Sequence, residues 1–217
     1  MRRNYWREYL AAAFLSAVWV AAARAQSPNF HRWSFEVGAG VTPTLGHTSD
    51  ELGTGWNVIG GAGYNFNSRF GADLQVMYDG LGVNSSVLKE FSVPGANAHL
   101  WGFTLDPIVR FRTHHRLGFY ITGGGGYYRR IVNFTRPTTA IVDVFDPFFG
   151  IIQPIVVPAS QTIGTITRVG WGENIGGGFT YKLGDGHEKL FVEARYHHIE
   201  TRPRSTDILP ITVGIRW

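Results

Sequence analysis

The 217-residue sequence contains no cysteine, and this absence excludes both a disulfide framework and a lipoprotein anchor. After the N-terminal segment there is no apolar run of about 18 or more residues, which excludes a membrane-spanning helix there. Glycine and aromatic residues are abundant instead, with 28 glycines and 14% aromatic side chains. If such a chain enters a membrane, it must do so as a closed β-barrel, because lipid cannot satisfy open strand edges.

The first 25 residues are typical of a secretory signal peptide. A basic start precedes an almost wholly apolar stretch, 10–22, which is too short to span a membrane. Ala23 and Ala25 flank Arg24 in the small-residue pattern of a cleavage site. We therefore expect cleavage that makes Gln26 the first mature residue, and residues 26–217 to form one domain.

The leader also accounts for most of the net positive charge. It holds four of the twenty basic residues and one of the sixteen acidic ones, so sixteen basic and fifteen acidic residues remain. This near neutrality gives no support to nucleic-acid binding. The sequence indicates no cofactor.

The last ten residues, 208–217, alternate strictly between apolar and polar or small side chains, which is the pattern of a strand with one apolar face. The apolar set near the terminus consists of Ile211, Val213, Ile215 and Trp217. This stretch resembles the C-terminal strand of bacterial outer-membrane barrels, which the barrel-assembly machinery recognises. It departs from that signal at Gly214, since the glycine usually lies further upstream.

Seven further stretches show the same alternation, and with the last ten residues they predict eight strands. They are 32–42, 56–66, 70–78, 100–112, 117–129, 166–183 and 190–198. The connections between them are alternately long and short until the last, which is intermediate. Short periplasmic turns and long outer loops are typical of outer-membrane barrels. We therefore predict an all-β fold, an eight-stranded antiparallel transmembrane up-and-down β-barrel.

Aromatic residues support this fold, because they gather at both ends of the predicted strands. One set, beside the short turns and termini, is Trp33, Phe66, Phe70, Phe111, Phe119, Tyr181 and Trp217; the opposite set is Trp56, Tyr78, Trp101, Tyr127, Trp171 and Tyr196. Two such girdles are expected where a barrel meets the two interfaces of a bilayer.

With leader, strands and girdles together, the chain resembles the OmpA/OmpX-type outer-membrane β-barrel superfamily. The stretches 176–181 (GGGFTY) and 193–196 (EARY) add local similarity. The resemblance implies outer-membrane lipid and the assembly machinery as partners, export through the periplasm of a Gram-negative-type bacterium, and a monomer.

Charged residues on the inward faces of the strands are the main candidate site inside the barrel. They are Glu36, Asp73, Asp106, Arg110, Arg112, Lys182, Glu193, Arg195 and Arg216. Four acids and five bases in the narrow interior of eight strands favour a network of ion pairs over a water-filled channel.

Two positions break the strand pattern. Pro107 cannot donate a backbone hydrogen bond in the middle of a strand, so we expect a β-bulge there. Glu173 falls on the apolar face of its strand. Either a bulge shifts the register near Glu173, or this level lies above the lipid.

The longest loop, 130–164, is far more apolar than a solvated loop. Its centre carries Phe145, Pro147, Phe148, Phe149 and Ile151. The loop extends the flanking strands as a protruding ribbon or forms a contact patch for a surface partner; packing against itself is the alternative.

The histidines are candidates for catalysis and for metal binding. The sequence around His198 is similar to the H-x-S-N site of barrel-type lipid A deacylases, but Glu200 stands where the nucleophilic serine would be. His114 and His115 have no third ligand at metal spacing. We therefore expect no catalytic residue and no metal site.

The sequence thus favours a non-enzymatic barrel that serves envelope integrity or surface contact through its outer loops. A small-conductance pore and a lipid A-modifying hydrolase are the two alternatives.

Overall fold

The computed structural model describes residues 31–90, 93–112, 116–184, 187–201 and 204–217. Signal-cleavage residues Ala23, Ala25 and Gln26, and the pair His114–His115, lie outside these ranges. No helix in the described part of the chain is long and apolar enough to cross a membrane.

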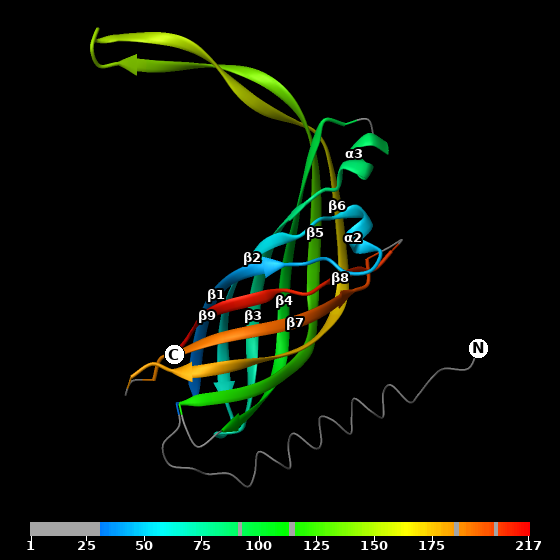
Figure 1. Ribbon diagram of the computed structural model, residues 1–217, viewed down its shortest axis with the longest axis vertical. Helices are drawn as coiled ribbons and strands as arrows, with labels where there is room; N and C mark the ends of the chain where they lie inside the picture. Colours follow the sequence, from blue (N-terminus) through cyan, green and yellow to red (C-terminus); the bar gives the residue numbers. More distant parts are fainter. Residues whose placement is uncertain (1–30, 91–92, 113–115, 185–186, 202–203) are drawn as a thin grey trace, which may run out of the picture.

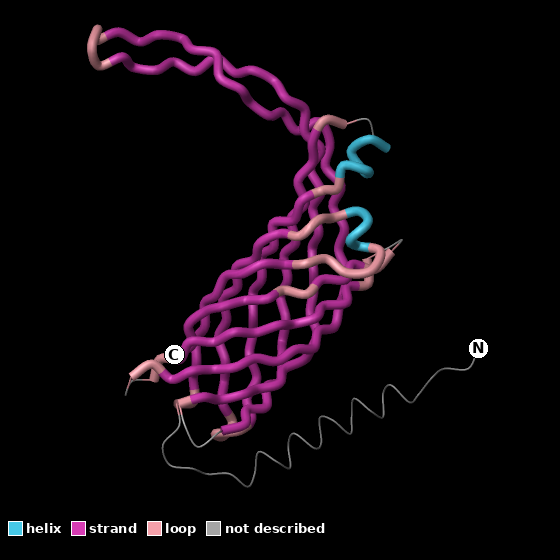
Figure 2. Tube along the Cα trace, in the orientation of Figure 1, coloured by secondary structure: helices cyan, strands magenta, loops and turns pink. Residues whose placement is uncertain are grey.

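The described residues form nine antiparallel strands and two short helices (Figures 1 and 2). The strands are β1 (Trp33–Thr42), β2 (Gly55–Asn65), β3 (Phe70–Gly82), β4 (Gly95–Arg112), β5 (Leu117–Asp146), β6 (Ile151–Lys182), β7 (Lys189–Ile199), β8 (Thr206–Ile208) and β9 (Ile211–Arg216); the helices are α2 (Thr48–Glu51) and α3 (Ser85–Glu90). Each strand up to β7 pairs with the next, and β9 lies between β7 and β1. The sheet therefore closes on itself as a barrel.

Strands β8 and β9 share the eighth position of the barrel. Both pair with β7 in one continuous register, in which His197 faces Ile208 and Ala194 faces Ile211. The interruption falls at Pro210, which has no amide hydrogen to donate. The expected eight-stranded up-and-down barrel is confirmed.

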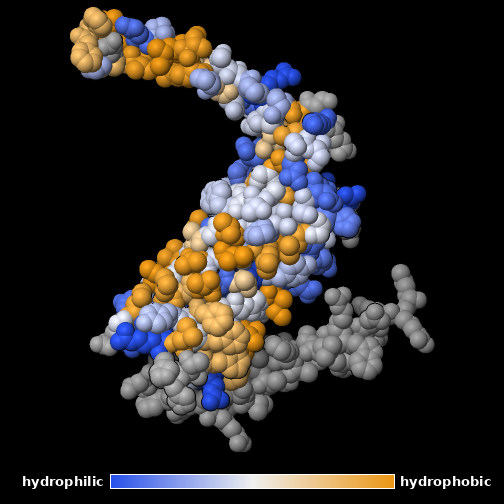
Figure 3. Space-filling view, in the orientation of Figure 1, coloured by the Kyte–Doolittle hydropathy of each residue, from blue (hydrophilic) through white to orange (hydrophobic). Residues whose placement is uncertain are grey.

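Side chains alternate between the lumen and the outside as the sequence pattern predicts. In β1, Phe35 is 44% exposed whereas Glu36 is 6% exposed. The outward apolar side chains form a hydrophobic zone on the barrel, visible as orange in Figure 3. The girdles also form, with Trp56, Tyr78 and Trp101 in contact near one end.

Inward glycines make room for large side chains in the narrow lumen. A Cβ atom added to Gly102 would lie 2.8 Å from the Tyr128 ring, and one at Gly178 would lie 2.7 Å from the Tyr120 hydroxyl. Both tyrosines are almost fully buried. The glycine-rich inner face thus allows aromatic rings to cross a narrow barrel.

The barrel has one compact end and one extended end. At the compact end, the turn from β2 to β3 is held by Asn67, whose side-chain Oδ1 accepts hydrogen bonds from the backbone of Arg69 and Phe70, both at 2.8 Å. At the other end β5 and β6 continue beyond the barrel as a two-stranded ribbon (Figure 1). We call the extended end the outer end, following the loop-length pattern.

The predicted loop 130–164 is therefore mostly strand. Pairing of β5 with β6 continues from the barrel to Asp146 and Ile151, with one register shift between Phe134 and Thr135. The protruding-ribbon alternative is confirmed. Strands β3 and β4 are also longer than predicted at this end. Strand β3 reaches Gly82, and β4 begins at Gly95.

The bulge expected at Pro107 is not found. The pairs Leu105–Gly125 and Ile108–Thr122 lie on either side of it in one unchanged register, and Pro107 faces Ala72 on β3. Because Pro107 has no backbone N–H, only the hydrogen bonds to β5 at this position are lost. The sheet keeps its register there without a β-bulge.

The register through Glu173 is likewise continuous, so the bulge proposed there is also wrong. Glu173 is exposed on the outward face and faces His198 on β7. The other alternative, that this level lies above the lipid, stays a prediction, and the polar neighbour is consistent with it.

Candidate functional site

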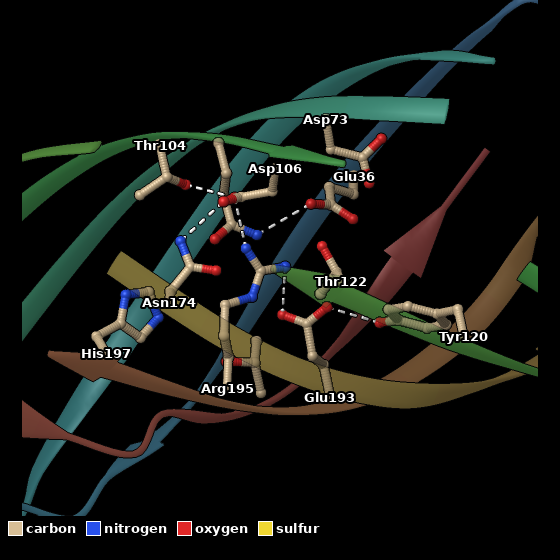
Figure 4. Close-up of polar contacts among 12 residues, drawn as sticks. Glu36, Asp73, Thr104, Asp106, Tyr120, Thr122, Asn174, Glu193, Arg195 and His197 are labelled. Carbon is tan, nitrogen blue, oxygen red and sulfur yellow. Dashed lines mark hydrogen bonds and ion pairs between the residues drawn. The ribbon is translucent and has the colours of Figure 1, made fainter. Parts of the chain in front are cut away.

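Two arginines organise the charged interior of the barrel. Arg195 on β7 places Nη1 2.6 Å from Asp106 Oδ2 on β4 and Nη2 2.8 Å from Glu193 Oε1 on its own strand (Figure 4). Neutral side chains donate further hydrogen bonds to both carboxylates. Tyr120 donates to Glu193 at 2.9 Å, and Asn174 and Thr104 donate to Asp106 at 2.7 and 2.6 Å.

Arg216 on β9 is the second centre. Its Nε is 2.9 Å from Glu36 Oε2, its Nη2 also contacts that oxygen, and Nη2 lies 3.6 Å from Asp73 Oδ2. The guanidinium carbon lies 4.8 Å from the centre of the Tyr120 ring, within the range of a cation–π contact. Tyr120 thereby touches both arginine centres, and Arg110 extends the cluster through Asp73 at 3.7 Å.

Seven of the nine predicted lumen residues are thus brought together, four acids with three bases. All but half-buried Arg110 are buried. Because a buried charge without a partner is costly, each member depends on the others. The arrangement holds β1, β3, β4, β7 and β9 together across the lumen, which is a structural task.

Lys182 does not join this network, so its assignment was wrong. It lies half-buried near the compact end of β6, directly opposite Lys189, and no ion pair forms with it among the described residues. The alternation of side chains assigned Lys182 to the inward face of β6 correctly, but it could not predict how far along the barrel axis the residue lies. The side chain of Arg112 lies outside the described part of the structure.

Sequence reasoning missed the neutral members of the network. Tyr120, Asn174, Gln75 and Thr104 share the inward face with the charges, so alternation places them there. The predicted network contained only charged side chains, so these neutral side chains were not part of it. Gln75, for example, donates to Glu36 Oε1 at 3.1 Å.

Nearer the outer end, a second layer of side chains fills the lumen. Tyr128 and His197 are hydrogen-bonded at 2.8 Å. Tyr128 also belongs to a buried apolar cluster, which consists of Ile59, Met77, Leu100, Tyr128, Phe191, Ile199 and Ile208. At these two levels the interior is packed with side chains.

On the outward face at the outer end, His198 meets Asp207. His198 Nδ1 lies 2.6 Å from Asp207 Oδ1, and Tyr196 donates to the same oxygen at 2.6 Å. A carboxylate that orients a histidine is one element of a hydrolytic site. In the described part of the chain, however, no hydroxyl group is hydrogen-bonded to His198. The sequence analysis missed Asp207, because pairing of β8 with β7 brings it there.

No group of three or more histidine or acidic side chains in the described ranges is placed to hold a metal ion. The residues of the predicted assembly signal all lie on the outward face, each 38–50% exposed: Ile211, Val213, Ile215 and Trp217. Phe35 on β1 contacts Trp217, with ring centres 6.3 Å apart.

The candidate contact residues lie at the far end of the ribbon. Phe148 and Phe149 in the turn are 93% and 75% exposed, and Phe145 and Ile151 flank them on the two strands with Pro147 in the turn. The structure places these apolar side chains in solvent, far along the ribbon from the barrel (Figure 3).

Solved structures of two outer-membrane proteins share this architecture with TM-scores above 0.5. Neisserial surface protein A (NspA) is 14% identical, with a TM-score of 0.57 over 86% of this chain and 96% of that chain. A major outer membrane protein from Thermus thermophilus is 12% identical, with a TM-score of 0.53 over 86% and 99%. Ail, the attachment invasion locus protein of Yersinia pestis, is 14% identical, with a TM-score of 0.46 over 85% and 97%.

No curated protein matches the chain. The model of the family described as outer membrane protein beta-barrel domain matches residues 10–215, nearly the whole chain. The chain therefore belongs to this outer-membrane family, as an eight-stranded β-barrel of the OmpA/OmpX type.

Proposed function

We propose that this protein is a non-enzymatic outer-membrane barrel that contacts a protein outside the cell through its ribbon, residues 136–161. One observation carries the proposal: the ribbon exposes apolar side chains on both faces, and neither of its edges pairs with another strand in the described part of the chain. Pairing of β5 with β4 ends at Thr135, and pairing of β6 with β7 ends at Gly172. Both strands continue well past those residues.

The chemistry of the ribbon favours a protein partner over a lipid surface. Its unpaired edges present backbone N–H and C=O groups, which hydrocarbon cannot satisfy. A strand from a partner would satisfy them by β-augmentation and would cover the apolar faces as well. An isolated two-stranded ribbon is also only marginally stable in water, so a partner would stabilise it.

The ribbon carries little charge to oppose such contact. Between Pro137 and Gln161 its only charged residues are Asp143 and Asp146. Ile141 and Ile152, on opposite strands, are 73% and 68% exposed. Exposed apolar surface of this kind indicates an interaction site.

The test is adhesion of cells that display the protein to other cells and to immobilised extracellular proteins. The first variant replaces 138–159 by Asn-Gly, a two-residue turn that rejoins the opposed pair Pro137 and Ser160. We expect it to lose adhesion while retaining heat-modifiable migration, which reports a folded barrel. Equal adhesion by the shortened variant would contradict the proposal.

Two point variants separate edge pairing from simple apolar attraction. Thr139→Lys places a charge on the β5 edge, where lysine disfavours strand addition. Phe148→Ser combined with Phe149→Ser removes the apolar tip and leaves both edges unchanged. We expect Thr139→Lys to reduce adhesion at least as much as the tip variant.

The two alternative functions receive less support. The packed lumen offers no observation in favour of a pore, and His198 lacks a hydrogen-bonded nucleophile for hydrolysis among the described residues. A bilayer recording tests the first alternative. A mass shift of lipid A on expression of the protein tests the second.

Assembly in the outer membrane also remains part of the proposal. We propose that the leader directs export and is removed after Ala25, and that the outward residues ending at Trp217 are read by the assembly machinery. N-terminal sequencing of membrane-extracted protein should then begin at Gln26. Mature protein that still begins at Met1 would contradict this assignment.

A further inference from the structure

At the outer end of the barrel, above the packed lumen, lies a cavity of about 440 Å³, which we call the vestibule. The inward faces of β5 and β6 form one side of it. Residues from the α2 and α3 segments and the stretch before β8 form the other. In Figure 1 this is the region where α2, α3, β5 and β6 meet, below the ribbon.

Two arginines stand directly opposite each other in the wall of the vestibule. Arg130 on β5 is the cross-strand partner of Arg168 on β6, and both line the cavity. An anion bound between the two strands would accept hydrogen bonds from both side chains.

Arg130 is incompletely satisfied by the protein. Its Nη1 donates to Thr206 Oγ1 at 3.0 Å, but its Nε is buried and has no hydrogen-bond partner. It forms no ion pair with any described residue. Burial lowers the pKa of Arg130, an effect that Glu51 opposes and Arg168 reinforces. The charge is therefore held in a partly dehydrated place without a full counter-charge.

Arginines outnumber acids among the described residues that line the vestibule. Arg204 also lines it, with Nη1 3.6 Å from Glu51 Oε1, and Glu51 is the one acid among the described lining residues. Guanidinium groups that converge on one cavity favour an anionic ligand.

The other surfaces of the vestibule are apolar. Leu52, Val83 and Val132 line it and belong to a packed cluster with Leu81 and Ala98. Along β5 and β6, Phe134 and Ile166 follow the arginine pair toward the outside, and Val87 of α3 lines the same cavity. Apolar surface therefore begins next to the cationic pair and continues outward from it.

We propose that the vestibule binds a small anionic amphiphile, a phosphate monoester with a short aliphatic chain. The terminal oxygens of a phosphate monoester can accept hydrogen bonds from two guanidinium groups at once. The aliphatic chain lies along Val132, Ile166 and Phe134. This site is independent of the ribbon and of any partner bound there.

Isothermal titration of the mature protein in zwitterionic nanodiscs tests the proposal, with hexyl phosphate as the probe and empty nanodiscs as reference. Inorganic phosphate supplies the head without the chain, and hexanol supplies the chain without the head. We expect hexyl phosphate to bind at least roughly tenfold more tightly than either. Equal affinity for inorganic phosphate would overturn the amphiphile assignment.

Variants locate the site. Arg130→Gln combined with Arg168→Gln should weaken hexyl phosphate binding by roughly tenfold or more. Val87→Asp should weaken it by placing a negative charge beside the aliphatic chain. Arg129→Gln is the matched control, because Arg129 is the next residue on β5, carries the same charge and faces the opposite side, where it is exposed.

Heat-modifiable migration of every variant shows that the barrel is folded. Unchanged affinity in the folded double-arginine variant, or an equal loss in Arg129→Gln, would overturn the proposal. Nanodiscs that contain phosphatidic acid distinguish the source of the ligand. If they prevent the titration of hexyl phosphate, the same site takes phosphomonoester headgroups from the membrane; an undisturbed titration assigns it to solutes.

Discussion

The wall of the barrel and the ribbon are built from the same two strands, yet they expose apolar side chains for different reasons. Within the barrel, β5 and β6 bury one face in the lumen and expose the other to lipid. In the ribbon both faces are exposed, and Ile141 and Val142, adjacent residues on β5, are 73% and 44% exposed. Figure 3 shows a more hydrophilic band between these two hydrophobic zones.

The difference shows what closure contributes to a β-sheet. A closed barrel pairs every edge and fills its inner face, so its apolar outer face needs only lipid. The ribbon has neither closure nor a second layer. Its length is set by β5 and β6, which have 30 and 32 residues where β2 has 11. At about 3.3 Å per residue, 136–146 alone extends roughly 35 Å.

The largest expected effect separates the two regions by stability. Arg195→Ala should lower the free energy of unfolding by about 3–5 kcal/mol, because Asp106 and Glu193 are left buried without their cation. Shortening the ribbon should leave the urea midpoint nearly unchanged. Urea titration followed by heat-modifiable migration measures both.

The same experiment tests coupling within the lumen. Adding Glu193→Ala to Arg195→Ala should cost less than the sum of the two single changes, because one uncompensated carboxylate is removed together with its cation. Additive losses would indicate that the network is solvated, and the pore alternative would then gain support.

The next effect compares one substitution in the two regions. Leu74 on the barrel is 58% exposed and Ile141 on the ribbon is 73% exposed, so exposure alone does not distinguish them. Leu74→Arg should cost about 2–4 kcal/mol if its surroundings are lipid, whereas Ile141→Arg should cost almost nothing in water. Equal costs, measured by unfolding in lipid vesicles, would contradict the division between lipid-facing wall and solvated ribbon.

A smaller effect concerns access from outside the cell. External protease on intact cells should cut within 130–164, most readily at the turn that carries Phe148 and Phe149. The short connections at 67–69 and 184–189 should remain protected, because they face the periplasm. Cleavage confined to those short connections would mean that the barrel has the opposite orientation.

The smallest effect lies at the outer rim. Partial burial raises the pKa of Asp207. Hydrogen bonds from Tyr196 and His198 lower it by more than burial raises it, so the net pKa is below the ordinary value of 3.8. The stabilisation is therefore present above the ordinary value and is lost as the pH falls through the lowered one. Amide hydrogen exchange in β8 should therefore increase as the pH falls through the lowered pKa of Asp207. Asp207→Asn should remove this pH dependence. Retention of the same dependence in Asp207→Asn would contradict the assignment.

The barrel could be predicted from the pattern within single strands. Alternation in steps of two is a local property of a strand, so it assigned Glu36, Arg195 and Arg216 to the inner face and Trp217 to the outer face before any pairing was known. It also identified the apolar centre of 130–164. It could not decide between ribbon and self-packed loop, because the same apolar residues can be exposed on a ribbon or buried within a loop that packs against itself.

Which inward residues meet could not be predicted in this way, because it depends on how the strands pair. Register between strands brings Arg195 to Asp106, places Arg130 opposite Arg168, and leaves Lys182 opposite another lysine. Likewise, pairing of β8 with β7 brings Asp207 to His198. Depth along the barrel and position across it depend on the closure of all the strands together, and no stretch of sequence contains that information on its own.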